Sequence, residues 1–128
     1  MLVKDIMVRD VVTVSPLASL RDALKLMKDH DLKSLVVEQQ TPHDAWGVVT
    51  YTNVLKTIVA EDGDIDLVNI YDVCAKPAIS VGESLDVRHV ARLMTDNGVK
   101  RVLVLHDNDL TGIVTMNDIV GTVMEMIE

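Results

Sequence analysis

Residues 112–118 read Gly-Ile-Val-Thr-Met-Asn-Asp, an apolar strand that ends in Thr-x-x-Asp and continues directly into the apolar pair Ile119-Val120. A strand that passes into a helix without a loop is expected here. A related stretch, Gly-Val-Val-Thr-Tyr-Thr-Asn, occupies residues 47–53 and precedes Val54-Leu55. This recurrence predicts that the chain is one structural unit written twice.

The rest of the chain repeats in the same order. At a shift of 67 residues the identical pairs are Asp5/Asp72, Val14/Val81, Arg21/Arg88, Leu26/Leu93, Met27/Met94, Asp29/Asp96, Lys33/Lys100 and Val37/Val104. Farther along the shift becomes 65, and Gly47/Gly112, Val49/Val114 and Thr50/Thr115 coincide. The first repeat therefore has two extra residues between its last two strands, where a loop tolerates insertion.

Hydrophobic periodicity predicts the same β-α-β-β-α order in each repeat. We expect repeat 1 at residues 1–60, an acidic linker at 61–69 and repeat 2 at 70–128. The predicted strands are 5–14, 35–37 and 46–50, then 72–81, 102–105 and 110–115. The predicted helices are 19–29, 52–60, 87–97 and 117–127, with turns at 39–45 and 106–109.

Composition limits the classes of function. The chain has 128 residues, enough for one compact domain, so the two repeats are expected to share a core. With 48% hydrophobic and 25% charged residues, and no apolar run near the ~18 residues of a membrane span, a soluble cytoplasmic protein is expected. The single Cys74 permits no internal disulfide, and no Cys/His spacing indicates a metal site. A net charge of −8 and few aromatic residues disfavour nucleic acid as a partner.

The motifs together resemble the cystathionine-β-synthase (CBS) domain over nearly the whole chain. The segments that carry the resemblance are Asp5-Ile6-Met7 with Thr13-Val14-Ser15-Pro16, Lys33 to Val37, Lys100 to Val104 and Gly112 to Asp118. The resemblance implies a tandem pair, or Bateman module, with a mixed α/β fold. In it two sheets pack about a pseudo-two-fold axis with helices outside, and two clefts accept AMP, ADP, ATP or S-adenosylmethionine.

Such modules are regulatory rather than catalytic, need no cofactor, sense energy state in many cases, and usually form homodimers. The resemblance thus implies a binding protein that signals to an unknown regulated partner.

Asp118 is the first candidate binding residue, because an ionised carboxylate at a helix start accepts both hydroxyls of a ribose. The competing interpretation is a capping box, in which Thr115 and Asp118 only satisfy the helix end; both roles can coexist. The resemblance assigns phosphate contact to basic residues before the third strand and adenine contact to apolar ones. The stronger cleft is predicted to contain Met7, Leu32, Lys33, Lys100, Arg101, Ile113, Thr115 and Asp118.

The first repeat has Asn53 in place of the acid and Ser34 in place of Arg101, so it lacks both charges. A second cleft, weaker or empty, is therefore predicted at Val48, Thr50, Asn53, Cys74 and Val99. Each apolar member of either set is equally credible as ordinary core.

Two alternatives remain open. The chain could be a structural homodimerisation module with vestigial clefts, because the last helix carries more apolar residues than one face needs: Ile119, Val120, Val123, Met124 and Ile127. A catalytic role has only the thiol of Cys74 in its favour.

Overall fold

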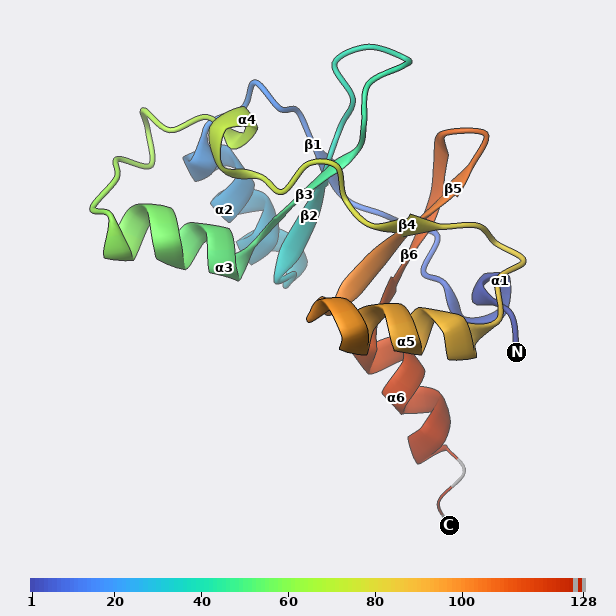
Figure 1. The fold of residues 1–128 in the computed structure, drawn as a ribbon. Coiled ribbons are helices and arrows are strands. Elements are labelled where there is room, and N and C mark those ends of the chain that lie inside the picture. Colours follow the sequence, from blue (N-terminus) through green and yellow to red (C-terminus); the bar gives the residue numbers. More distant parts are fainter. Residues whose placement is uncertain (126, 128) are drawn as a thin grey trace. The chain divides into compact units, whose positions relative to one another are not determined.

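The computed structural model describes residues 1–125 and residue 127. By its internal contacts the chain divides into two compact units. We call Val12–Ala78 the central unit, and Met1–Val11 together with Ile79–Glu128 the terminal unit. These boundaries do not follow the sequence repeats, because each unit contains the opening segment of the other repeat (Figure 1).

The central unit is built on a three-stranded sheet in the order β1-β2-β3. Strand β1 pairs in parallel with β2, and β2 pairs antiparallel with β3. The elements are β1 (Thr13–Val14), α2 (Leu20–His30), β2 (Ser34–Val37), β3 (Gly47–Thr50), α3 (Tyr51–Val54), a π-helix (Leu55–Ala60) and α4 (Ile70–Val73).

The terminal unit repeats this arrangement with β4-β5-β6, β4 parallel to β5 and β5 antiparallel to β6. Its elements are α1 (Val3–Ile6), β4 (Ser80–Val81), α5 (Val87–Asn97), β5 (Arg101–His106), β6 (Asp109–Thr115) and α6 (Met116–Met124). Two three-stranded sheets with helices confirm the mixed α/β fold class.

The long helices are α2 and α5, and both were predicted from their apolar spacing. In α2 the side chains of Leu20, Ala23 and Met27 are buried, and Ser19 caps the helix by accepting the Asp22 N–H. Helix α5 ends at Gly98, whose φ of 64° is a left-handed conformation that glycine adopts without strain.

The predicted strands at residues 5–14 and 72–81 are wrong. Both segments begin with one helical turn, α1 and α4, and only residues 13–14 and 80–81 form strands. The spacing of buried residues explains the difference: Val3 and Met7 are both buried at i and i+4, which a helical turn places on one side. Tertiary packing therefore overrides the β-propensity of these segments.

Three helix and turn boundaries also differ from the prediction. The second predicted helix is α3 followed by the π-helix, and the last helix ends at Met124 rather than Ile127. The turn between β5 and β6 is shorter than predicted, with Asp107 and Asn108 at positive φ.

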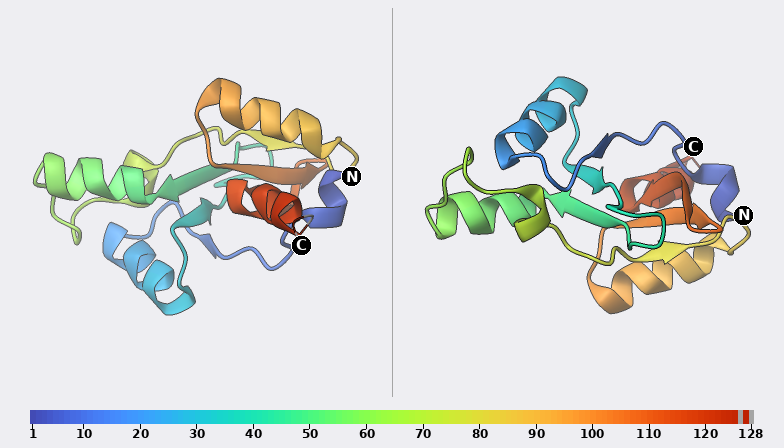
Figure 2. Two further views of the ribbon diagram at one scale, coloured as in Figure 1. Left: turned by 90° about the horizontal axis from the view of Figure 1, so that it is seen from below. Right: turned by 90° about the horizontal axis from the view of Figure 1, so that it is seen from above.

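Each unit has its own buried cluster, and both clusters contain residues of both repeats, so the repeats share two cores where one was predicted. In the terminal unit Val3 and Met7 pack with residues of the second repeat, including Val102 and Val114. In the central unit Ile70 packs in the same way with residues of the first repeat. Figures 1 and 2 show α1 among the elements of the terminal unit. The exchange of opening segments thus completes each core.

Candidate ligand site

The strand-to-helix corner of the terminal unit is closed by Thr115 and Asp118. The Thr115 N–H donates to Asp118 Oδ2 at 2.8 Å, and the Asp118 N–H donates to Thr115 Oγ1 at 3.3 Å. This is the capping box that the sequence offered as one interpretation. Asp118 is half-buried, and its second oxygen, Oδ1, has no hydrogen-bond partner among the described residues. One acceptor oxygen therefore remains available at the helix start.

A positively charged side chain lies beside this corner, on the neighbouring strand β5. Arg101 pairs with Thr115 between β5 and β6, and the preceding Lys100 accepts the Met116 N–H at its carbonyl at 2.7 Å. Arg101 is half-buried, and its Nε is buried without a hydrogen-bond partner in the part of the chain that the structure describes. Burial lowers the pKa of Arg101, yet a guanidinium stays protonated at neutral pH. A desolvated positive charge without a counter-ion is energetically costly, and an anion would relieve that cost.

Residues from the start of the chain reach the same strand. Val8 and Ile113 exchange two backbone hydrogen bonds of 2.9 and 3.0 Å. The preceding Met7 lies against Gly112, where an added Cβ would come within 2.9 Å of Met7 Sδ and 3.0 Å of Val8 O. Glycine is needed here because the backbone of the N-terminal segment approaches so closely.

The central unit repeats this geometry. Val48 and Ala75 exchange two backbone hydrogen bonds of 2.9 Å. A Cβ at Gly47 would lie 3.1 Å from Ala75 O and 3.4 Å from Cys74 Sγ. The Tyr51 N–H donates to the Lys33 carbonyl at 3.2 Å, as Met116 does to Lys100.

The two corners differ in the group that they leave available. Asn53 Oδ1 accepts the Thr50 N–H at 2.8 Å and the Thr50 hydroxyl at 3.1 Å. Because a backbone N–H can only donate, the amide oxygen must face Thr50 and the NH₂ group must face away. The central corner therefore offers a neutral donor where the terminal corner offers a charged acceptor. Opposite Thr50, in the position of Arg101, stands Ser34.

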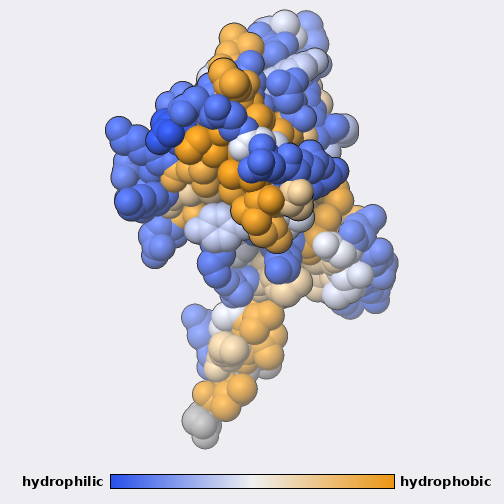
Figure 3. Space-filling view, turned by 90° about the vertical axis from the view of Figure 1, so that its left-hand side faces the viewer, coloured by the Kyte–Doolittle hydropathy of each residue, from blue (hydrophilic) through white to orange (hydrophobic). Residues whose placement is uncertain are grey.

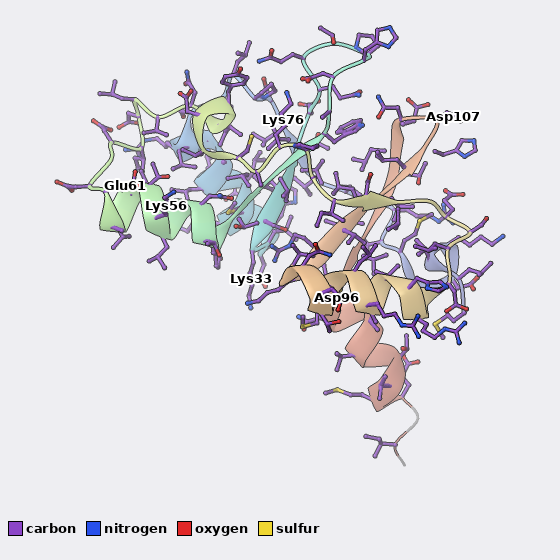
Figure 4. All side chains as sticks on the ribbon, viewed as in Figure 1. Lys33, Lys56, Glu61, Lys76, Asp96 and Asp107 are labelled. Atoms are coloured by element: carbon purple, nitrogen blue, oxygen red, sulfur yellow. The ribbon has the colours of Figure 1, made fainter. Side chains whose placement is uncertain are left out.

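The structure groups the predicted site residues by unit. The terminal unit brings together Met7, Lys100, Arg101, Ile113, Thr115 and Asp118, and it also contains Val99; the central unit contains Leu32, Lys33, Val48, Thr50, Asn53 and Cys74. Lys33 is exposed, and its side chain extends away from the ribbon in Figure 4. That Leu32 and Lys33 join the Asp118 site, and Val99 the Asn53 site, stays a prediction.

Sequence reasoning did not identify the roles of Gly112 and Gly47, or of Val8 and Ala75. The coincidence of the two glycines at a shift of 65 was the available signal. Burial raises the pKa of the Cys74 thiol, which keeps it in the neutral form and works against a nucleophilic role. Within residues 1–125 and 127 there is no cluster of His, Cys, Asp and Glu suited to a metal ion, and no helix long and apolar enough to cross a membrane.

Comparison with known proteins finds relatives in both sequence and fold. The chain is 32% identical over 112 residues to an uncharacterized protein of Methanopyrus kandleri, covering 87% of this chain but only 57% of that relative. A hexameric CBS-CP12 protein from bloom-forming cyanobacteria superposes with a TM-score of 0.90 at 32% identity, over 100% of this chain and 75% of that one. A CBS domain pair solved with 5′-methylthioadenosine and S-adenosyl-L-methionine superposes at 0.86 with 26% identity, over 98% of both chains.

The family model for the CBS domain matches residues 3–60 and again residues 70–125. Those two matches contain both strand-to-helix corners, each with its paired glycine and its Thr-x-x-Asp or Thr-x-x-Asn sequence. The chain therefore belongs to the CBS-domain family, as a tandem pair of CBS domains.

Proposed function

We propose that this chain is a regulatory module that binds an adenosine-containing ligand at the Asp118 corner and signals to a partner protein. Support comes from the related domain pair that binds 5′-methylthioadenosine and S-adenosyl-L-methionine. The module is proposed to be non-catalytic and to need no resident cofactor. In this proposal Asp118 Oδ1 accepts the ribose hydroxyls, while Oδ2 continues to hold the Thr115 N–H.

The single observation that carries the choice of ligand is Arg101. Its buried Nε without a partner favours a ligand that brings negative charge. AMP, ADP and ATP are net negative through their phosphates, whereas S-adenosylmethionine, with a sulfonium, an ammonium and a single carboxylate, is net positive. We therefore propose an adenine nucleotide, with a role in energy sensing, in preference to S-adenosylmethionine.

The adenine is proposed to lie against Met7 and Ile113, which the paired backbones of Val8 and Ile113 hold together. An apolar surface with a few backbone polar groups is sufficient to orient a purine. Leu32 and Lys33 are proposed as further contacts of the same ligand. The partner is proposed to distinguish the ligand-bound module from the ligand-free one.

The test is a thermal-shift and calorimetric titration of nucleotide-free protein with AMP, ADP, ATP and S-adenosylmethionine. A nucleotide at ~100 times its Kd adds about 2.7 kcal/mol to the free energy of unfolding, so a clear rise in Tm is expected. Arg101→Met keeps the aliphatic length but removes the guanidinium, and it should weaken nucleotide binding by roughly 10- to 100-fold through lost charge-assisted hydrogen bonds. Arg92→Met, an exposed site on α5, is the matched control and should bind as wild type does. If none of the four compounds at millimolar concentration moves the melting curve, the proposal is wrong.

The alternative function, a structural homodimerisation module, is supported by the last helix of each repeat. Equivalent positions at a shift of 65 carry exposed apolar side chains: Tyr51 (53%), Leu55 (60%) and Val59 (67%) on α3 and the π-helix, and Met116 (39%), Val120 (40%) and Met124 (64%) on α6. Figure 3 shows hydrophobic residues along α6. Exposed apolar stripes of this kind are typical of surfaces through which proteins associate.

Sedimentation separates the two functions. A dimer that Val120→Asp converts to a monomer, combined with no nucleotide response, would favour the structural module over the ligand-binding one. If the wild-type chain is a monomer at micromolar concentration, the structural module is ruled out and the ligand-binding module acts without a homodimer.

A further inference from the structure

A second apolar surface lies in the central unit. Two segments run side by side here: the Leu20 N–H donates to Val68 O at 2.8 Å, and the Ile70 and Tyr71 N–H groups donate to Ala18 O and Pro16 O at 2.9 Å. Along these segments Leu17, Leu67 and Tyr71 are 73%, 79% and 55% exposed. We call these three residues the α4 face.

The fold does not require apolar residues at this surface. In the terminal unit the same pairing of segments occurs, with the Val3 N–H donating to Leu85 O at 2.9 Å and the Val87 N–H to Met1 O at 3.0 Å. At the shift of 67, however, the counterparts of Leu17 and Tyr71 are Ser84 and Lys4. Because the polar versions support the same local structure, the apolar ones in the central unit need another explanation. Clusters of exposed apolar residues that the fold does not need are typical of interaction surfaces.

The charge around the α4 face indicates what could cover it. Residues 61–72, which include Leu67 and Tyr71, carry five carboxylates and no Lys or Arg: Glu61, Asp62, Asp64, Asp66 and Asp72. The nearby cations are already paired, since Arg21 donates to both oxygens of Asp66 and Lys76 Nζ lies 2.6 Å from Asp44 Oδ2. Of the five carboxylates, Asp66 alone has a cationic partner within the described part of the chain. The segment that supplies Leu67 and Tyr71 therefore carries an excess of negative charge, and the one cation recorded against Tyr71, Lys76 with its Nζ 5.9 Å from the ring centroid, is already paired with Asp44.

We propose that the α4 face docks a basic, apolar segment of the regulated partner, in which apolar side chains cover Leu17, Leu67 and Tyr71 and flanking Lys or Arg residues meet the surrounding carboxylates. Tyrosine is favoured at the centre of such contacts because it supplies a large apolar area at a low entropic cost. Complementary charge adds specificity and speeds association. The proposal rests on the proposed function only for the existence of a partner, because no atom of the Asp118 corner takes part in it.

The test uses two labelled model peptides and the nucleotide-free full chain. One peptide is an amphipathic helix of Leu and Lys, and the other has Glu at every Lys position. Fluorescence anisotropy should show binding of the Lys peptide and at least about tenfold weaker binding of the Glu peptide. Binding of the Lys peptide should weaken as salt is raised, since exposed charges are screened.

The surface is located with matched variants. Leu17→Ser/Leu67→Ser should weaken binding of the Lys peptide by at least about tenfold, whereas Leu55→Ser/Val59→Ser on the π-helix should leave it unchanged. Tyr71→Ser repeats the test with an independent change at the same face. All of these residues are exposed, and circular dichroism checks that each variant stays folded.

Equal binding by wild type, Leu17→Ser/Leu67→Ser and Tyr71→Ser would overturn the proposal. So would a self-association, seen by sedimentation, that Leu17→Ser/Leu67→Ser abolishes, because the α4 face would then be an interface between copies of this chain. If no nucleotide binds but the Lys peptide still does, the proposed ligand is wrong and the proposal for the α4 face is retained.

Discussion

Replacing Asp118 by Asn separates helix capping from ligand binding in one substitution. The first repeat already has Asn at the equivalent position. Asn53 Oδ1 accepts the Thr50 N–H at 2.8 Å, the same distance at which Asp118 Oδ2 accepts the Thr115 N–H. Asp118→Asn is therefore expected to keep the cap. The stability that it loses is the attraction of a carboxylate to the helix N-terminus, about 0.3–1 kcal/mol.

The effect on ligand binding should be larger than the effect on stability. With the amide oxygen turned toward Thr115, the available group becomes an NH₂ donor in place of Oδ1. A hydrogen bond to a charged acceptor contributes about 1.5–3 kcal/mol, so AMP affinity should fall roughly 10- to 150-fold. Asp118→Ala should lose a similar amount of affinity and, in addition, about 1 kcal/mol of stability through the lost cap.

Calorimetric titration with AMP and thermal melts in parallel measure both quantities. Asp96→Asn is the matched control, because it removes one exposed carboxylate of the terminal unit (Figure 4) and changes the net charge equally. AMP affinity in Asp118→Asn equal to that of the control would show that Asp118 is a helix cap only.

Two further predictions concern packing and pH. Gly112→Ala places a Cβ 2.9 Å from Met7 Sδ and should cost about 1–3 kcal/mol of stability, whereas Gly82→Ala meets nothing within 4 Å and should change Tm little; equal melting curves would contradict the close approach. The hydrogen bond from Lys76, and then the backbone N–H of Gln40, hold the pKa of Asp44 below its usual range. The stabilisation of the folded state by the ionised Asp44 is complete above about pH 4 and is lost as the pH falls through the lowered pKa. The Tm of wild type should therefore fall more steeply on acidification than that of Asp44→Asn. Parallel curves would refute the pairing.

The local features of this protein follow from its sequence. Ser19, Gly98 and the apolar spacing of α2 and α5 define helices through contacts within a few residues. The pair Thr115 and Asp118 is equally local, since its two hydrogen bonds span three positions of one helix start. The duplication itself could be recognised because identical residues recur at a fixed shift.

Only the tertiary structure determined which segments complete each core. The β-branched residues before Val14 favour a strand, yet Val3 and Met7 form a helical turn because burial against the second repeat outweighs local propensity. The pairing of Val8 with Ile113 joins opposite ends of the chain. Likewise, nothing near Arg101 in the sequence predicts that its Nε is buried without a partner. Local order is set by neighbouring residues, whereas burial depends on distant ones that meet only in the folded chain.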